Sequence, residues 1–147
     1  MNICGIHGLK HWERVRENAE YLARQSGGDS LLCQLFAYLH DCCRESDGAD
    51  PEHGARAAAF AKTLLGKLLP LDDDRFELLA FACEHHEKGR TTDDATVGAC
   101  WDADRLDLGR VGIHPNRKYL STAAAKRKSV IDWGYRRSRG QDVRLKG

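Results

Sequence analysis

The residues of this sequence that could carry out chemistry are its histidines and carboxylates, and the pair His40-Asp41 is the most informative of them. This pair ends the most apolar segment of the sequence. Burying an imidazole beside a carboxylate is costly unless both groups have partners. A divalent cation is one such partner, because His nitrogen and Asp oxygen are suitable ligands for zinc, manganese, iron or nickel. The pair could instead cap a helix end and remain half exposed.

Other histidines and carboxylates could complete such a site. His7 and His11 are four residues apart, so they share one face of a helix. The segment 84–87 reads Glu-His-His-Glu, and the segment 102–107 reads Asp-Ala-Asp-Arg-Leu-Asp. Adjacent residues of a helix point about 100° apart, so only one histidine of the His-His pair is expected to face the site.

These motifs resemble those of the HD-domain superfamily of metal-dependent phosphohydrolases. The shared order is a His, then His-Asp, then a late Asp inside Ala-Asp-Arg-Leu; here it is His11, His40-Asp41 and Asp104, within residues 7 to 114. The late motif is similar to that of HD-type guanosine polyphosphate hydrolases, in which the Asp after Ala is a metal ligand. The resemblance implies that these four residues hold a divalent metal ion, with Asp102 as the alternative to Asp104.

A second metal ion is also implied by the resemblance. His53 and the His85-His86 pair are similar to the additional ligands of two-metal HD enzymes such as HD-GYP phosphodiesterases. His86 is the preferred candidate of the pair. Lys88-Gly89-Arg90 stands where those enzymes have Gly-Tyr-Pro, so a cyclic dinucleotide substrate is not implied. The expected cofactor is one or two ions of Mn, Zn, Fe, Ni or Mg.

Several neighbouring residues could assist the reaction. Asp41 is expected to be catalytic as well as a ligand, and Arg44, three residues later, could bind a substrate phosphate through two hydrogen bonds. Some HD hydrolases have a catalytic Glu at the position of Arg44. Asp107 could orient a ligand or pair with Arg110. Arg105 and Arg110 are expected to form surface ion pairs, with binding of the substrate as the alternative. His114, which precedes a proline, is expected to have no role.

The chemistry of such a site favours hydrolysis of a phosphate ester. A bound divalent ion lowers the pKa of its water from 15.7 to about 7 and offsets charge on a phosphoryl oxygen. The sequence therefore predicts a metal-dependent phosphohydrolase that acts on a small phosphorylated molecule, with a nucleotide as one candidate. The alternatives are a di-iron HD-type oxygenase and a non-catalytic module that binds a metal or a nucleotide.

The elements that must position these residues are helices. Spacings of three and four between apolar residues, with turn residues between the segments, predict an all-α fold. We expect a single-domain bundle of about six helices, HD-domain-like in architecture. Residues 31–44, apolar nearly all round, are expected to form the central helix. The expected helices cover residues 9–25, 31–44, 53–69, 72–86, 92–108 and 122–135.

Composition and charge restrict the class of protein further. Hydrophobic residues make up 41% and charged residues 31% of the 147, which is typical of one globular domain. No apolar run approaches the ~18 residues of a membrane span, and the N-terminal residues do not resemble a signal peptide. A cytoplasmic protein without a membrane partner is therefore expected. The six cysteines form no C-x-x-C pair and are expected to be reduced.

The C-terminal segment differs from the rest of the chain in charge. Residues 126–146 contain 8 basic and 2 acidic residues, whereas the net charge of the whole chain is +1. We therefore expect an HD-domain-like metal-binding domain over residues 1–125 and a basic helix and tail over residues 126–147. A solvated helix is the favoured interpretation of this segment, and nucleic acid is not an expected partner. The sequence does not indicate an oligomeric state.

Overall fold

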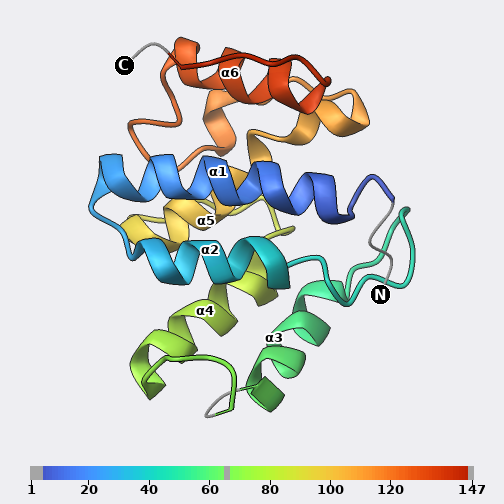
Figure 1. Ribbon diagram of the computed structural model, residues 1–147, viewed down its shortest axis with the longest axis vertical. Coiled ribbons are helices and arrows are strands. Elements are labelled where there is room, and N and C mark those ends of the chain that lie inside the picture. Colours follow the sequence, from blue (N-terminus) through green and yellow to red (C-terminus); the bar gives the residue numbers. More distant parts are fainter. Residues whose placement is uncertain (1–4, 65–66, 146–147) are drawn as a thin grey trace.

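The computed structural model describes residues 5–64 and 67–145, and within these ranges all regular elements are helices (Figure 1). The prediction of an all-α fold is therefore confirmed. The α-helices are α1 (Leu9–Ser26), α2 (Ser30–Leu39), α3 (His53–Leu64), α4 (Asp73–His85), α5 (Ala95–Arg105) and α6 (Lys128–Ser138), and the short 3₁₀ helices are η1 (Leu108–Val111) and η2 (Arg117–Tyr119). No helix in these ranges combines the length and the apolar character that crossing a membrane requires.

The predicted helix starts are correct where a capping residue fixes them. Asp72 accepts a hydrogen bond from the Arg75 amide, and α4 begins directly after it, as expected. Asp94 accepts from the Val97 amide, so α5 begins at Ala95 and not at residue 92. The last helix begins at Lys128 and not at residue 122, because residues 122–127 form turns.

The predicted ends of two helices differ more from the structure. Helix α2 ends at Leu39, five residues before the expected end, because tight turns follow it: the amides of Cys42 and Arg44 bond to the carbonyls three residues earlier. This places His40 and Asp41 at a helix terminus. Helix α3 ends at Leu64, and residues 65–66 of the expected helix lie outside the described residues.

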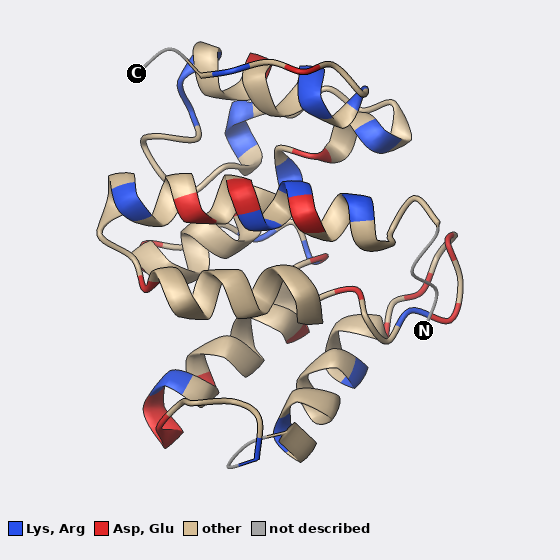
Figure 2. Ribbon diagram, viewed as in Figure 1, with Lys and Arg blue, Asp and Glu red and all other residues tan. Residues whose placement is uncertain are grey.

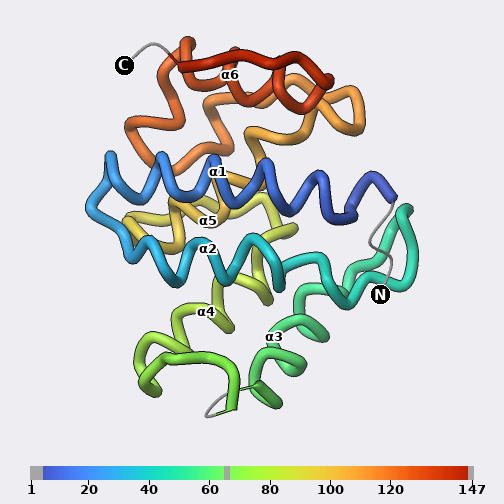
Figure 3. Tube along the Cα trace, viewed as in Figure 1, coloured from blue at the N-terminus to red at the C-terminus, as the bar shows by residue number. Residues whose placement is uncertain are grey.

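The central helix of the domain is α5 and not α2. Every residue from Thr96 to Arg105 is buried, whereas Leu31 and Tyr38 of α2 remain 40% and 38% exposed. Helices α1 and α2 lie side by side across α5 and run in opposite directions (Figure 3). No Lys, Arg, Asp or Glu occurs along α2, whereas α1 carries both signs of charge (Figure 2). The apolar character of α2 indicated burial on all sides, but one of its faces stays open.

Two close helix contacts depend on glycine. A Cβ atom on Gly54 of α3 would lie 2.6 Å from the Cys83 carbonyl oxygen of α4, so only glycine allows these two helices to approach this closely. In the same way, a Cβ on Gly134 of α6 would lie 2.9 Å from the Leu106 carbonyl oxygen. The first contact joins the helix that begins with His53 to the helix that ends directly before His86. The second packs α6 against the residues that follow α5.

Candidate metal centre

Helix termini bring the candidate ligands together at one side of the domain. His11 lies in the first turn of α1, and Asp104 lies in the last turn of α5. His53 is the first residue of α3, whereas His40 and His86 directly follow α2 and α4. Each of these residues is at most 8% exposed, as is Asp41. Such burial of polar groups requires that their partners lie within the cluster or in the backbone around it.

Backbone carbonyls fix the tautomer of three of the imidazoles. The Nδ1 atom of His40 lies 3.0 Å from the Ala37 oxygen, and the Nδ1 atoms of His53 and His86 lie 2.6 Å from carbonyl oxygens of the preceding turn. Since a carbonyl oxygen only accepts, each Nδ1 carries the proton and donates it. In the neutral ring the Nε2 lone pair is then available to a metal ion.

A carboxylate fixes the fourth imidazole. His11 Nδ1 lies 2.7 Å from Asp107 Oδ2, and Arg14 binds the same carboxylate through Nε at 2.7 Å and through Nη2 at 3.0 Å. The arginine compensates the charge of Asp107, while the carboxylate directs Nε2 of His11 toward the cluster. An imidazole held by a carboxylate in this way is a stronger metal ligand.

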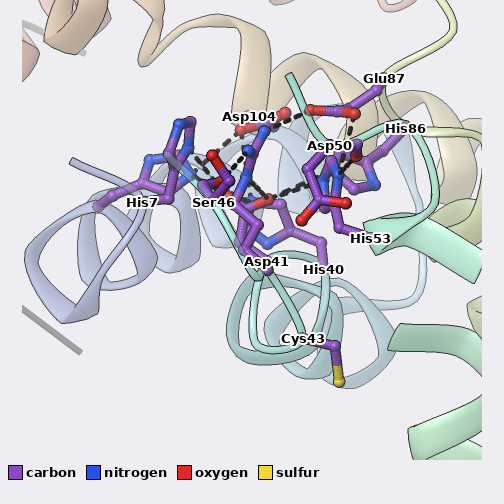
Figure 4. Close-up of polar contacts among 12 residues, drawn as sticks. His7, His40, Asp41, Cys43, Ser46, Asp50, His53, His86, Glu87 and Asp104 are labelled. Carbon is purple, nitrogen blue, oxygen red and sulfur yellow. Dashed lines mark hydrogen bonds and ion pairs between the residues drawn. The ribbon is translucent and has the colours of Figure 1, made fainter. Parts of the chain in front are cut away.

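The Asp41 carboxylate lies between two pairs of imidazoles (Figure 4). Its Oδ2 atom is 3.2 Å from Nε2 of His11 and 3.5 Å from Nε2 of His40. Its Oδ1 atom is 3.0 Å from Nε2 of His53 and 3.5 Å from Nε2 of His86. One carboxylate therefore faces two separate groups of nitrogen donors.

Asp104 completes the first of these groups. Its Oδ1 atom is 3.3 Å from His11 Nε2 and 3.4 Å from His40 Nε2, and it has no hydrogen-bond partner among the described residues. A buried carboxylate oxygen without a donor is an unsatisfied acceptor that a cation would satisfy.

The nitrogen donors show the same requirement for a cation. Nε2 of His11 and Nε2 of His40 are 3.1 Å apart, and the Nε2 atoms of His53 and His86 are 2.9 Å apart. Because Nδ1 carries the proton of each neutral ring, these contacts would place two lone pairs against each other. A proton or a metal ion must lie between them. The mixture of nitrogen and oxygen donors fits zinc, iron, manganese or nickel.

In the metal-free protein, the carboxylates of the cluster favour the protonated form of His11 and His53. Burial alone would lower the pKa of His11, but the carboxylates of Asp104, Asp107 and Asp41 raise it to about 9. The pKa of His53 is likewise raised to about 9, where Asp41 and Glu87 outweigh burial. Burial opposes ionisation of Asp41, yet the surrounding histidines hold the pKa of this carboxylate far below its usual range.

The structure also separates the alternatives that the sequence left open. Asp102 accepts hydrogen bonds from the amides of Ser121 and Thr122 and lies outside the cluster. His85 faces Glu84 at 3.7 Å, whereas His86 lies inside the cluster. His7 lies at its edge, with Nδ1 3.3 Å from Asp41 Oδ2. His114 is remote and packs against Tyr135.

The expectation that Arg105 and Arg110 form surface ion pairs is wrong, since both side chains are buried. Arg105 is 7% exposed, and the Arg110 side chain is 8% exposed. Arg105 donates to the carbonyl oxygen of Tyr119, which lies further along the chain, whereas Arg110 donates to the Asp107 carbonyl oxygen three residues before it. Arg44, one turn past Asp41, donates from Nε to Asp41 Oδ1 at 3.2 Å and pairs with Glu87.

Two residues of the cluster were not predicted as part of it. Arg14 is the partner of Asp107, and its position three residues after His11, on the same helical face, was the available signal. Glu87 lies 3.0 Å from Nδ1 of His53 through its Oε2 atom and follows the His-His pair directly.

A cleft of about 440 Å³ opens beside the cluster, between Glu87 and Arg110. Its lining includes His86 and Asp104, so the cleft reaches two of the candidate ligands.

The fold and the cluster define a class: an all-helical domain whose helix ends could hold divalent metal ions around one shared carboxylate. A comparison with models of protein families matches the HD domain over residues 8–127. The chain therefore belongs to the HD-domain family, as its motifs predicted. The comparisons with curated proteins and with solved structures gave no match.

Proposed function

We propose that this protein is a metal-dependent phosphohydrolase that cleaves a small phosphorylated molecule, for which a nucleotide is one candidate. The observation that carries the proposal is the position of Asp41 between two pairs of imidazoles with free Nε2 atoms. A divalent ion bound there supplies a water of lowered pKa and offsets charge on a phosphoryl oxygen. Membership of the HD family supports the same reaction class.

The donor positions support a two-ion arrangement. His11, His40 and Asp104 would bind one ion together with Asp41 Oδ2, since all these donor atoms lie within 3.5 Å of His11 Nε2 or His40 Nε2. His53 and His86 would bind the second ion together with Asp41 Oδ1. Asp41 would then bridge the two ions.

The residues around the ligands prepare them for this role. Asp107 keeps the His11 imidazole in the orientation that presents Nε2. Arg44 holds Asp41 through Oδ1 and also binds the carbonyl oxygens of Ser46 and Gly48, so it fixes the loop that follows the His-Asp pair. The cleft is small, which favours a small substrate over a polymer.

The first experiment is to measure the metal content of the purified protein and of single-ligand variants. We expect His40→Ala to lose the ion of the first group and His53→Ala to lose the ion of the second, while both variants keep their helicity. His85→Ala is the matched control, because His85 adjoins the cluster but does not face it. The metal-loaded wild type is then tested against a panel of phosphate esters.

Each outcome separates the candidate functions. Release of phosphate that the His40→Ala variant lacks supports the proposal. Bound iron, visible colour and no phosphatase activity would favour a di-iron oxygenase instead. A folded wild type that takes up no metal from manganese, zinc or nickel solutions would contradict the metal centre itself and favour a binding module.

A further inference from the structure

The cleft beside the metal cluster is lined by three arginines, which differ in how their donors are used. These are Arg44, Arg105 and Arg110. A guanidinium group binds phosphate through N–H donors that no other acceptor occupies. The hydrogen bonds of each arginine therefore show which of them is available to a phosphorylated substrate.

Arg105 and Arg44 already use more of their N–H donors. Arg105 donates from Nη1 to the carbonyl oxygens of Arg90 and Tyr119, at 2.5 and 2.7 Å, and its Nη2 atom lies 3.4 Å from the His86 carbonyl oxygen. Arg44 donates to Asp41, to two carbonyl groups of the following loop and to Glu87. These side chains hold the walls of the cleft together, and using either for substrate would break existing bonds.

Arg110 is engaged much less completely. Its Nη1 atom donates to the Asp107 carbonyl oxygen at 3.0 Å and lies 4.0 Å from Asp107 Oδ2, whereas Nη2 makes only long contacts, 3.6 Å to Asp104 Oδ1 and 3.5 Å to His7 Nδ1. Its Nε atom is buried and has no hydrogen-bond partner among the described residues. A buried N–H without an acceptor costs free energy that an anionic ligand would recover.

The surrounding charges favour binding of an anion at Arg110, beside His7, over binding at Arg44, beside Glu87. Glu87 neutralises Arg44, and Figure 4 shows Glu87 and His7 on opposite sides of the cluster. Arg14 compensates Asp107 through two hydrogen bonds. Asp104 faces the Nε2 atoms of the first ligand group, so a bound ion would take up its charge. Arg110 would then pair only with Asp107, through a 4.0 Å contact to a carboxylate that Arg14 already binds, and would keep positive charge for an anion.

We propose that Arg110 binds the phosphoryl group of the substrate, which enters on the His7 side of the cluster. Nε and Nη2 of a guanidinium form a two-pronged donor that matches two oxygens of one phosphoryl group. The inference rests on the proposed phosphohydrolase function and assigns the substrate contact to Arg110, whereas the sequence had indicated Arg44. Arg110 would contact only the phosphoryl group, so the organic part of the substrate is limited only by the size of the cleft.

Binding of inorganic phosphate to the manganese-loaded protein tests this assignment without relying on turnover. Calorimetric titrations would compare the wild type with Arg110→Ala, Arg110→Lys and the control Arg24→Ala, which removes an exposed guanidinium of α1. We expect Arg110→Ala to weaken phosphate binding roughly 10- to 100-fold, the range for hydrogen bonds to charged groups, and Arg24→Ala to change nothing. The metal content and the unfolding temperature of every variant are measured in parallel.

Kinetics with a phosphate monoester and added guanidinium complete the test. If the wild type hydrolyses the ester, Arg110→Ala should raise KM, and guanidinium ions should restore part of the lost activity. Undiminished phosphate binding by metal-loaded Arg110→Ala would overturn the assignment. Loss of metal from Arg110→Lys would also overturn it, since Arg110 would then act through Asp104. If the wild type binds phosphate through Arg110 but hydrolyses no ester, the proposed function fails while the binding assignment stands.

Discussion

A single buried contact with Asp107 orients the imidazole of His11. Asp107 accepts the Nδ1 proton at 2.7 Å and thereby leaves the Nε2 lone pair for a metal ion. We expect Asp107→Asn to weaken metal binding roughly 10- to 100-fold, the effect typical of partners that orient metal ligands. Titration of the loaded protein with a chelator measures this change.

The matched control for this prediction is Asp102→Asn, which makes the same substitution at an equally buried carboxylate. Asp102 binds the amides of Ser121 and Thr122, so its loss should lower the unfolding temperature without changing metal affinity. Equal metal affinity in the wild type and Asp107→Asn would show that Asp107 does not orient His11.

The protonation of His11 and His53 predicts how the metal-free protein responds to pH. Their folded-state pKa values of about 9 exceed the ordinary value of 6.5 because nearby carboxylates outweigh burial. Their contribution to stability is therefore complete below pH 6.5 and is lost as the pH rises toward 9. Metal binding displaces these protons, so metal affinity should increase over the same range.

Thermal unfolding of the metal-free protein between pH 6 and 9.5 checks this prediction, together with metal titrations across that range. The His53→Gln variant should show a shallower loss of stability with pH than the wild type. A stability profile that rises from pH 6.5 to 9 would contradict the assigned protonation states.

Of the two alternatives that the sequence left open at each position, the preferred residues His86 and Asp104 are the ones that lie in the cluster, although the helical pattern alone did not decide between them. His85 and His86 are both histidines at the end of one helix, and only the actual helix end decides which faces the cluster. Asp102 and Asp104 both lie in α5, but Asp102 faces the Thr122 amide and Asp104 faces His40. Arg110 could not be recognised as buried, because its neighbours His7 and Asp104 come from separate parts of the fold.

At the scale of elements, the contact between α3 and α4 controls the second group of ligands. Gly54 follows His53 directly, and a Cβ atom there would lie 2.6 Å from the Cys83 carbonyl oxygen and 2.8 Å from that of Glu84. We expect Gly54→Ala to force the helices apart, at a cost of about 1–3 kcal/mol, the range for overpacked cores. The separation of His53 from His86 should then remove one of two metal ions.

Metal content and thermal unfolding measure both effects in one set of samples. Gly48→Ala is the control, because a Cβ atom there meets only the Ser46 hydroxyl at 3.5 Å, an ordinary contact. A Gly54→Ala variant that retained the full metal content of the wild type would show that the helix spacing does not set the second group.

The sequence predicted the existence of these helices but not all of their ends. Apolar residues three and four apart dictate a helix wherever one face must be buried, which is why α1 and α4 lie close to their predicted ranges. The end of α2 at Leu39 depends on bonds of the following turns. This early end matters for the site, because it brings Asp41 between histidines at the ends of α1, α3 and α4.

At the scale of the whole molecule, the ligands gather at helix ends, whereas α6 packs on η1 and α1 (Figure 1). Gly134 permits the close approach of α6 to Leu106, and Val130 and Ile131 on the same helix are buried. Gly134→Ala should therefore destabilise the fold by about 1–3 kcal/mol through overpacking, with the ligand positions unchanged.

The increase in unfolding temperature on metal binding distinguishes a variant that only destabilises the fold from one that also loses a metal ion. A ligand that binds only the folded state stabilises it by about 2.7 kcal/mol at a free concentration of 100 Kd. We expect Gly134→Ala to unfold at a lower temperature than the wild type both with and without metal. Metal should nevertheless raise its unfolding temperature as much as it raises that of the wild type. In Gly54→Ala this rise should be smaller. If the rise were smaller in Gly134→Ala as well, the packing of α6 would have to position η1 and the metal ligands next to it, so stability and metal binding would be one property of this fold.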